Sequence, residues 1–243
     1  MQNVKWQPDS FELQATSIWE FPDRGKWATH EASYRGNWSP YIPRNIILRY
    51  SNEQDLVLDQ FVGSGTTLIE AKLLNRNAIG IDVNQKALSS AYKKCSFEGG
   101  GKVYFRIGDA RDLSCIPDES IDLICTHPPY ANIIKYSDCI EEDLSRVSVR
   151  QFLLEICKVA DESFRVLKPG KFCAILMGDI RRKGFVFPLG FNVMERFQRS
   201  GFLLKEVVIK KQYNCRATNK WILKSKEANF LLLAHEYLFV LKK

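Results

Sequence analysis

The sequence of 243 residues has no apolar run long enough to cross a bilayer, and its first ten residues, MQNVKWQPDS, lack the apolar segment of a secretory signal. Its seven cysteines are odd in number and include no CxxC pair, which disfavours zinc and disulfide frameworks and favours reduced thiols. These absences predict a cytoplasmic protein with no membrane partner. Because no internal repeat or low-complexity linker occurs, we expect one domain over residues 1–243.

Acidic residues are scarce in the second half of the chain. Residues 1–130 hold 14 Lys and Arg against 16 Asp and Glu, whereas residues 131–243 hold 21 against 12. Within 181–226 the count is 12 basic and two acidic residues. A solvated surface explains a few such charges, but a block this one-sided favours a polyanionic partner.

Strand-like and helix-like segments alternate after an aromatic-rich, irregular segment at 1–37. Expected strands are 56–59, 78–82, 102–107, 121–125, 171–177, 202–209 and 230–241, and expected helices include 66–74, 85–95, 149–166 and 190–199. This order predicts an α/β fold with a doubly wound, mostly parallel, seven-stranded sheet and a terminal antiparallel hairpin. Ligands in such sheets bind at the carboxyl ends of the strands.

A glycine-rich loop follows the first of these strands, with Gly63 and Gly65 flanking Ser64. A phosphate-binding P-loop needs a lysine after the last glycine, and none follows Gly65. A dinucleotide fingerprint needs a third glycine where Leu68 stands. What remains is either a simple turn or a loop that meets the small charged end of a nucleotide-like ligand, with Asp82 placed to hold a ribose.

The chain resembles S-adenosylmethionine-dependent DNA amino-methyltransferases once THPPY at 126–130 is set beside FVGSGTT at 61–67. VLKPGK at 166–171 also fits the family. The resemblance implies a class I methyltransferase (Rossmann-like) fold and S-adenosylmethionine as cofactor, without a metal. It further implies that Asp82 binds the ribose and Asp109 the adenine. The expected cofactor-binding residues are Asn37, Asp59, Phe61, Gly63, Gly65, Thr66, Asp82, Asp109 and Ala110.

The resemblance places the catalytic residues at His127, Pro128, Pro129 and Tyr130. In the family, the side chain at the first position and the following carbonyl accept hydrogen bonds from the target amine, and the aromatic residue stacks on a flipped base. This chain departs twice, with Gln60 in place of a usual Pro and His127 in place of the usual Asp, Asn or Ser. A neutral imidazole can accept a hydrogen bond, although packing or capping of the loop is the alternative role of His127.

The implied activity is methyl transfer to cytosine N4 or adenine N6 of double-stranded DNA, with the target base flipped out, in a restriction-modification system. The Pro-Cys dipeptide that C5 methylation needs is absent from the catalytic loop. An RNA guanine-N2 methyltransferase and a non-catalytic nucleic-acid-binding protein on a decayed fold stay open as alternatives. Target recognition then depends on residues 1–37, on the basic loops of 179–229, on a protein partner or on a homodimer. The candidate phosphate contacts are Lys135, Arg181, Arg182, Lys183, Lys211, Arg216 and Lys220.

Overall fold

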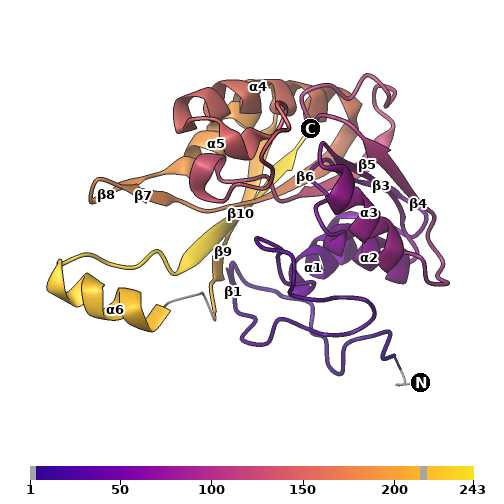
Figure 1. Ribbon diagram of the computed structural model, residues 1–243. Coiled ribbons are helices and arrows are strands. Elements are labelled where there is room, and N and C mark those ends of the chain that lie inside the picture. The colour runs from indigo at the N-terminus through magenta and orange to yellow at the C-terminus, as the bar shows by residue number, and fades with distance from the viewer. Residues whose placement is uncertain (1–3, 214–217) are drawn as a thin grey trace.

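The computed structural model describes residues 4–213 and 218–243 and is built on an eight-stranded sheet (Figure 1). The strand order is β1-β9-β10-β6-β5-β2-β3-β4. The bounds are β1 Ile18–Trp19, β2 Leu56–Asp59, β3 Asn77–Asp82, β4 Val103–Ile107, β5 Ile121–Thr126, β6 Leu167–Met177, β9 Leu203–Lys211 and β10 His235–Lys242. Strands β2 to β6 pair in parallel, and β10 runs antiparallel to both β6 and β9. The predicted parallel sheet with a terminal antiparallel hairpin is confirmed.

Helices cover both faces of the sheet (Figure 1). On one face α1 Tyr41–Tyr50, α2 Thr66–Leu73 and α3 Gln85–Lys94 pack over one core cluster, and on the other α4 Val149–Val166 and α5 Leu189–Arg199 pack over a second. In α4 the fully buried Phe152 and Ile156 lie four residues apart and so share a face. The Ser148 side chain starts this helix by accepting from the Gln151 amide.

Two connections contain structure that the sequence did not predict. Residues expected to be a loop after β6 form a hairpin of β7 Ile180–Arg182 and β8 Phe185–Phe187. Its turn residues Lys183 and Gly184 both have positive φ, +48° and +85°, as two-residue hairpin turns require. The basic link after β9 contains the helix α6 Thr218–Glu227, which has little apolar periodicity to reveal it.

Strand boundaries also differ from the expectation, and one strand was not expected. Strand β10 begins at His235, so residues 230–234 are not part of it, and β6 begins at Leu167 directly after α4. The irregular N-terminal segment contributes the two-residue strand β1, which pairs in parallel with β9 through Ile18 and Ile209. A strand this short exists because the neighbouring edge offers hydrogen bonds, and its own sequence carries no signal.

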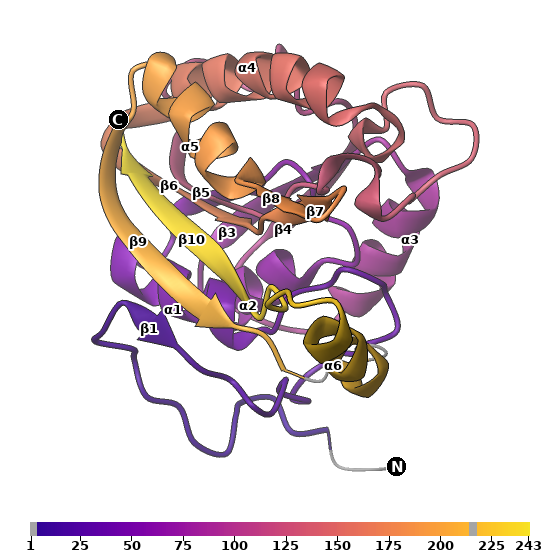
Figure 2. The same ribbon diagram turned by 90° about the vertical axis from the view of Figure 1, so that its left-hand side faces the viewer.

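The hairpin β7–β8 and helix α6 project on the same side of the molecule (Figures 1 and 2). The hairpin follows the carboxyl end of β6, and α6 connects the end of β9 to the start of β10. Both therefore flank the edge of the sheet at which parallel strands present ligands. No helix in the described residues is long and apolar enough to span a membrane. The described cysteines are free thiols, and Cys215 lies outside the described residues.

Candidate active site

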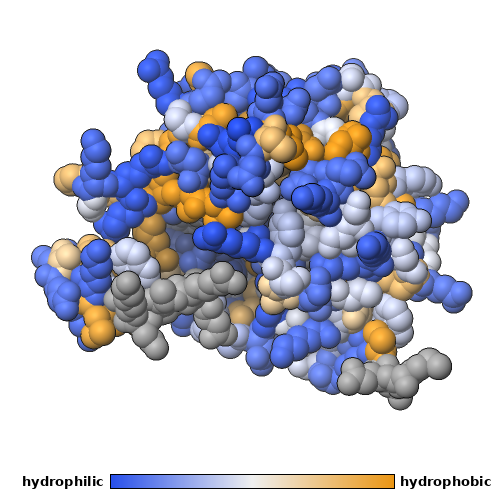
Figure 3. Space-filling model, viewed as in Figure 1, coloured by the Kyte–Doolittle hydropathy of each residue, from blue (hydrophilic) through white to orange (hydrophobic). Residues whose placement is uncertain are grey.

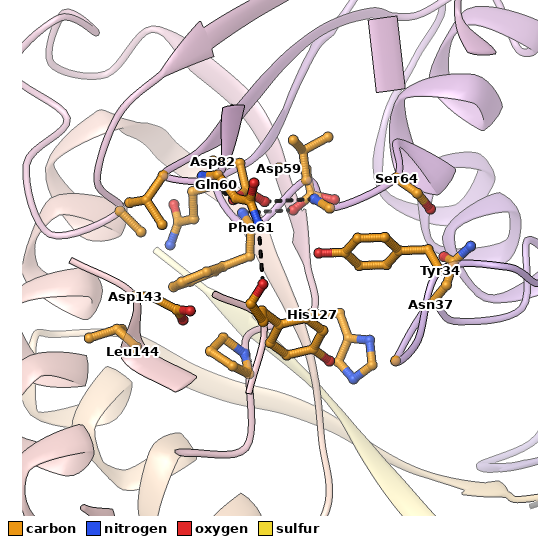
Figure 4. A pocket seen from close by; sticks show the side chains of 18 of the residues that line it. Tyr34, Asn37, Asp59, Gln60, Phe61, Ser64, Asp82, His127, Asp143 and Leu144 are labelled. Carbon is orange, nitrogen blue, oxygen red and sulfur yellow. Dashed lines mark hydrogen bonds between the residues drawn. The ribbon is translucent and has the colours of Figure 1, made fainter. Parts of the chain in front are cut away.

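A cavity lies at the carboxyl ends of β2, β3, β4 and β5 (Figure 4). Together with its open mouth it holds about 800 Å³ of space. Most of the residues predicted from the sequence line it: Asn37, Asp59, Phe61, Gly63, Thr66, Asp82, Asp109, Ala110, His127 and Pro129. Gly65, Pro128 and Tyr130 are not among its lining residues. The expected cofactor loop and the expected catalytic loop thus open onto one space.

The glycine loop is held in shape by backbone bonds and by two left-handed residues. Gly63 and Gly65 have φ of +50° and +89°, which side-chain-bearing residues rarely adopt. A Cβ on Gly65 would approach the Ala91 backbone to 3.2 Å, so Gly65 serves close packing against α3. Ser64 lies between them, and its buried hydroxyl has no hydrogen-bond partner within residues 4–213 and 218–243. An orphaned hydroxyl on a cavity wall is a group left for a ligand.

Asp82 links the glycine loop to the end of β3. Its Oδ2 accepts from the Gly63 amide over 2.9 Å, and its Oδ1 accepts from the Asn84 amide over 2.9 Å. Burial raises the pKa of the carboxyl, while these two amide hydrogen bonds work to lower it. An ionised carboxylate has about four lone-pair sites, so each oxygen can accept once more. Asp82 can therefore shape the loop and still hold hydroxyl groups of a ligand.

Asp59 is a brace inside the same loop. Its carboxylate accepts from the hydroxyls of Thr67 on α2 and Thr126 on β5, and from the amide of Phe61. Burial raises its pKa to about 6, against the lowering effect of these hydrogen bonds. With three protein donors in place, the side chain positions the loop more than it offers contacts to a ligand. Gln60, which stands where the family usually has Pro, donates to Ser163 of α4 over 2.8 Å.

Asp109 lines the cavity while its carboxylate is held by Arg111. Nε and Nη2 of Arg111 donate to it over 2.6–3.0 Å, and Nη1 donates to Glu155 on α4 over 2.8 Å. The pair of carboxylates raises the pKa of Arg111 above its ordinary value, with the Asp109 hydrogen bonds as the main cause. Asp109 is thus fixed in place before any ligand arrives.

The N-terminal segment forms one wall of the cavity. Asn37 accepts from the Thr66 hydroxyl, and Tyr34 stacks on Tyr136 with ring centroids 5.9 Å apart. Figure 4 shows Tyr34 and Asn37 on one side of the cavity and Asp143 on the other. Because burial raises the pKa of Tyr136 to about 12, its hydroxyl stays protonated. The irregular segment therefore closes over the cofactor loop.

A buried ionic cluster fastens this segment to α2. Glu70 accepts from Nε1 of Trp27 over 2.7 Å and from Nη1 of Arg44 over 2.9 Å, and it contacts Nε2 of His30 at 2.7 Å. Glu70 is fully buried, so each partner replaces hydration that the carboxylate has lost. These contacts fix the N-terminal segment, which forms one wall of the cavity, to α2.

His127 and Tyr130 contact each other, and Tyr130 also contacts the strand β10. Nε2 of His127 lies 3.1 Å from the Tyr130 hydroxyl, which donates to Oε1 of Glu236 over 2.7 Å. Lys210 of β9 donates to Oε2 of Glu236 over 2.9 Å. Burial lowers the pKa of His127 to about 4, and it raises that of Tyr130. At neutral pH His127 is therefore uncharged and capable of accepting a hydrogen bond.

Several residues at the site were not predicted from the sequence. Glu142, Asp143 and Leu144 line the cavity from a loop that carries no motif. Glu236 and Lys210 reach the catalytic loop from strands assigned only to the sheet. The sequence held one sign that Glu236 could belong to a site. Glu236 is an acid near the start of a mostly apolar strand, and a buried acid requires a partner.

The candidate phosphate contacts that the structure describes lie on separate segments of the chain. Arg181 donates to the carbonyls of Gly184 and Leu231 over 2.7 and 2.8 Å, and Arg182 donates to Asn132 just beyond the catalytic loop. Lys135 and Lys211 form exposed pairs with nearby acids. Lys183 occupies the hairpin turn. Arg216 lies outside the described residues, as does the side chain of Lys220.

Within the described residues, no three His, Cys, Asp or Glu side chains converge in an arrangement that suits a metal ion. Hydrophilic side chains cover much of the surface on the side from which the hairpin and α6 project, and apolar groups are exposed between them (Figure 3). Phe185 of the hairpin is 79% exposed.

Known proteins resemble the chain over different parts of its length. A family model described as DNA methylase matches residues 2–93, and one described as methyltransferase domain matches residues 51–229. The type II methyltransferase M.HpaI of Haemophilus parainfluenzae is 35% identical over 45% of this chain and 34% of its own length. A tRNA (guanine(10)-N2)-dimethyltransferase of Methanothermobacter thermautotrophicus is 34% identical over 40% of this chain and 29% of its own length. The matches thus span about a third of these curated relatives.

The fold has matches of greater coverage. An S-adenosylmethionine-dependent methyltransferase from Methanosarcina mazei superposes with a TM-score of 0.56 at 19% identity, covering 82% of this chain and 96% of that one. This likeness confirms the class I methyltransferase fold. The DNA methylase model spans FVGSGTT and supports the resemblance that this motif indicated, and the methyltransferase domain model spans both FVGSGTT and THPPY. Because the methyltransferase domain model covers more than half of the chain, the protein belongs to the methyltransferase domain family.

Proposed function

We propose that the protein transfers a methyl group from S-adenosylmethionine to an exocyclic amino nitrogen of a base in DNA, cytosine N4 or adenine N6, within a restriction-modification system. The observation that carries this proposal is that His127 and Pro129 line the same cavity as the glycine loop and Asp82. A donor held by that loop and an amine held by the catalytic loop then meet in one space. The likeness to DNA methylases over residues 2–93 supports DNA as the substrate.

The cavity residues fit S-adenosylmethionine. Asp82 keeps unused lone pairs for the ribose hydroxyls, and the unpartnered Ser64 hydroxyl stands in the loop that receives the methionine end. Ala110 and Asp109 line the wall expected to face the adenine, and Asn37 closes the opposite side. When bound, the cofactor supplies a methyl group already activated by a sulfonium, so the chain must contribute positioning more than acid or base strength.

The catalytic loop prepares the amine. The nitrogen lone pair of an exocyclic amine is delocalised into its ring, which makes the amine a weak nucleophile. Hydrogen bonds from the amine to His127 and to the Pro128 carbonyl would favour tetrahedral geometry and localise that lone pair. The neutral state of His127 supports this role, since burial lowers its pKa to about 4. Pro129 restricts the backbone before it, and Tyr130 offers a ring to stack on the flipped base.

Duplex DNA would approach the side from which the β7–β8 hairpin and α6 project. Arg181, Arg182 and Lys183 lie on the hairpin, and Lys224 and Lys226 lie in the last turn of α6. Positive charge on both projections favours contact with phosphates on either side of the cavity mouth. A second copy or a partner protein would add recognition of the target sequence.

Incubation with methyl-labelled S-adenosylmethionine tests the proposal. Duplex DNA and tRNA are offered in parallel, and the products are digested to nucleosides. We expect label in N4-methylcytosine or N6-methyladenine. Label found only in RNA would overturn the DNA assignment and favour the guanine-N2 activity named in the tRNA-modifying relative. Cofactor binding without transfer to either substrate would contradict an autonomous enzyme and indicate that a partner is required.

A further inference from the structure

Four side chains from distant parts of the sequence form one hydrogen-bonded row at the catalytic loop. His127 contacts the Tyr130 hydroxyl, that hydroxyl donates to Glu236, and Lys210 donates to the other oxygen of Glu236. Glu236 is only 8% exposed, and Tyr130 lies 106 positions from it in the sequence. A buried carboxylate is costly unless it is paired, so this one calls for a reason beyond stability.

The protons of the row can be placed by counting donors. Burial acts to raise the pKa of Glu236, but the charge of Lys210 holds it below its ordinary value, so the carboxylate is ionised and only accepts. Burial and the Glu236 charge raise the pKa of Tyr130, so its hydroxyl keeps its single proton and directs it to Glu236. The Tyr130 oxygen can then only accept from His127. The imidazole proton therefore sits on Nε2.

The other ring nitrogen of His127 is left as a bare acceptor. Nδ1 has no hydrogen-bond partner in the described ranges 4–213 and 218–243, and the residue lines the cavity. The ring stacks on Trp38, with centroids 5.5 Å apart and planes at 26°, which restrains its orientation. A ring nitrogen with a free lone pair is thus available on a residue that lines the cavity.

We propose that Glu236, held by Lys210, is a positioning residue that acts through Tyr130 to fix His127 as the Nε2–H tautomer, so that Nδ1 accepts a hydrogen bond from the amino group of the target base. The inference rests on the proposed function, which supplies that amine. It also accounts for a histidine where the resemblance implies Asp, Asn or Ser. Those residues offer an acceptor oxygen, whereas a neutral imidazole offers an acceptor at Nδ1 in one tautomer and a donor in the other.

The tautomer can be measured without any substrate. The chain has three histidines, so long-range ¹H–¹⁵N spectra of ¹⁵N-histidine-labelled protein are simple to assign, with His127→Asn removing one set of signals. We expect the Nε2–H form for His127. In Glu236→Gln, Lys210 takes the amide oxygen and the amide nitrogen turns toward Tyr130. The tyrosine proton is then redirected to Nε2, and His127 switches to the Nδ1–H form.

Two spectral results would overturn the proposal. One is a wild-type His127 protonated on Nδ1, and the other is a Glu236→Gln variant that keeps the Nε2–H form. If Glu236→Gln does not fold, Tyr130→Phe replaces it, because loss of the hydroxyl should leave a mixture of tautomers. A pure Nε2–H form in Tyr130→Phe would count equally against the proposal.

Kinetics in two backgrounds separate orientation from general support of the fold. Glu236→Gln should lower kcat about 10²-fold, the size of effect seen when one hydrogen-bonding group is lost from a transition state, with the KM for cofactor unchanged. In a His127→Asn background the same change should cost far less, because a carboxamide oxygen accepts without any tautomer. Equal losses in both backgrounds would reduce Glu236 to structural support. If His127→Asn is inactive, the spectra alone decide.

The matched control is Tyr237→Phe. Tyr237 forms a similar row with Nε2 of His235 at 2.9 Å and with Asp179 at 3.4 Å, one residue further along β10. Its loss should change neither the His127 tautomer nor kcat. Wild-type protein that shows the tautomer and its switch but methylates only RNA would refute the DNA assignment and leave the proposal for the row standing. Wild-type protein that methylates DNA but holds His127 in the Nδ1–H form would support the proposed function and refute the positioning role of Glu236.

Discussion

The two ends of the cavity are built over different distances in the sequence. At the cofactor end, Asp82 binds the Gly63 amide 19 positions away, and strand, loop and helix follow one another directly. At the catalytic end, Tyr130 depends on Glu236, 106 positions away. The glycine loop and Asp82 therefore belong to one local unit of strand, loop, helix and strand, whereas the catalytic end needs the terminal hairpin to be folded against the parallel strands.

The largest expected effect lies at the catalytic end. Replacing Tyr130 by Ala removes a stacking surface worth about 1–3 kcal/mol and leaves the His127 ring without its partner, so transfer should fall about 10³-fold or more. Calorimetry should show unchanged affinity for S-adenosylmethionine, because Tyr130 does not line the cofactor cavity. Robust transfer by this variant would show that Tyr130 does not stack on the target base. It would also contradict the proposed assignment of methyl transfer to this end of the cavity.

A change at the cofactor end should show the reverse pattern. Asp82→Ala removes an ionised acceptor worth about 1.5–3 kcal/mol, so the Kd for S-adenosylmethionine should rise about 10- to 100-fold, with kcat at saturating cofactor largely retained. Asp122→Ala is the matched control, because this acid pairs with Lys168 and Lys171 at the start of β5, away from the cavity. Similar losses of affinity in both variants would assign the effect to the fold.

The projections beside the catalytic end should respond to salt. Replacing Arg181 and Arg182 by Ala should weaken DNA binding severalfold and reduce the slope of log K against log salt by about one for each lost phosphate contact. Arg199→Ala is the control, since it removes an exposed arginine of α5 that pairs with Glu195. Unchanged affinity and slope in the double variant would show that the DNA does not contact the hairpin.

The smallest expected effect concerns Asp59 and stability. Burial raises its pKa to about 6 in the folded protein, above the ordinary value of 3.8, so the folded state favours the protonated form. The resulting stabilisation is present at low pH and is lost as pH rises through 6. The Tm of the wild type relative to Asp59→Asn should therefore increase by up to a few degrees between pH 7 and pH 5. If the difference in Tm between the two proteins does not change with pH, the three hydrogen bonds offset the effect of burial on the pKa of Asp59.

What could be predicted from the sequence follows the same division. FVGSGTT and Asp82 lie close together in the chain, and their short-range pattern pointed to residues that line the cavity. THPPY pointed to His127 and Pro129, which line the same cavity, but nothing near it in the sequence points to Glu236. The β7–β8 hairpin and α6 were missed because their residues are mainly basic or exposed and lack a clear apolar period.

The placement of β10 has a consequence for biosynthesis. It is the last of the eight strands to leave the ribosome, yet it lies inside the sheet between β6 and β9 and carries Glu236 to the catalytic loop. A nascent chain can form the glycine loop and its neighbouring strands early, but the row that orients His127 stays incomplete until β10 has been inserted. The proposed transfer therefore requires β10 to be in place between β6 and β9.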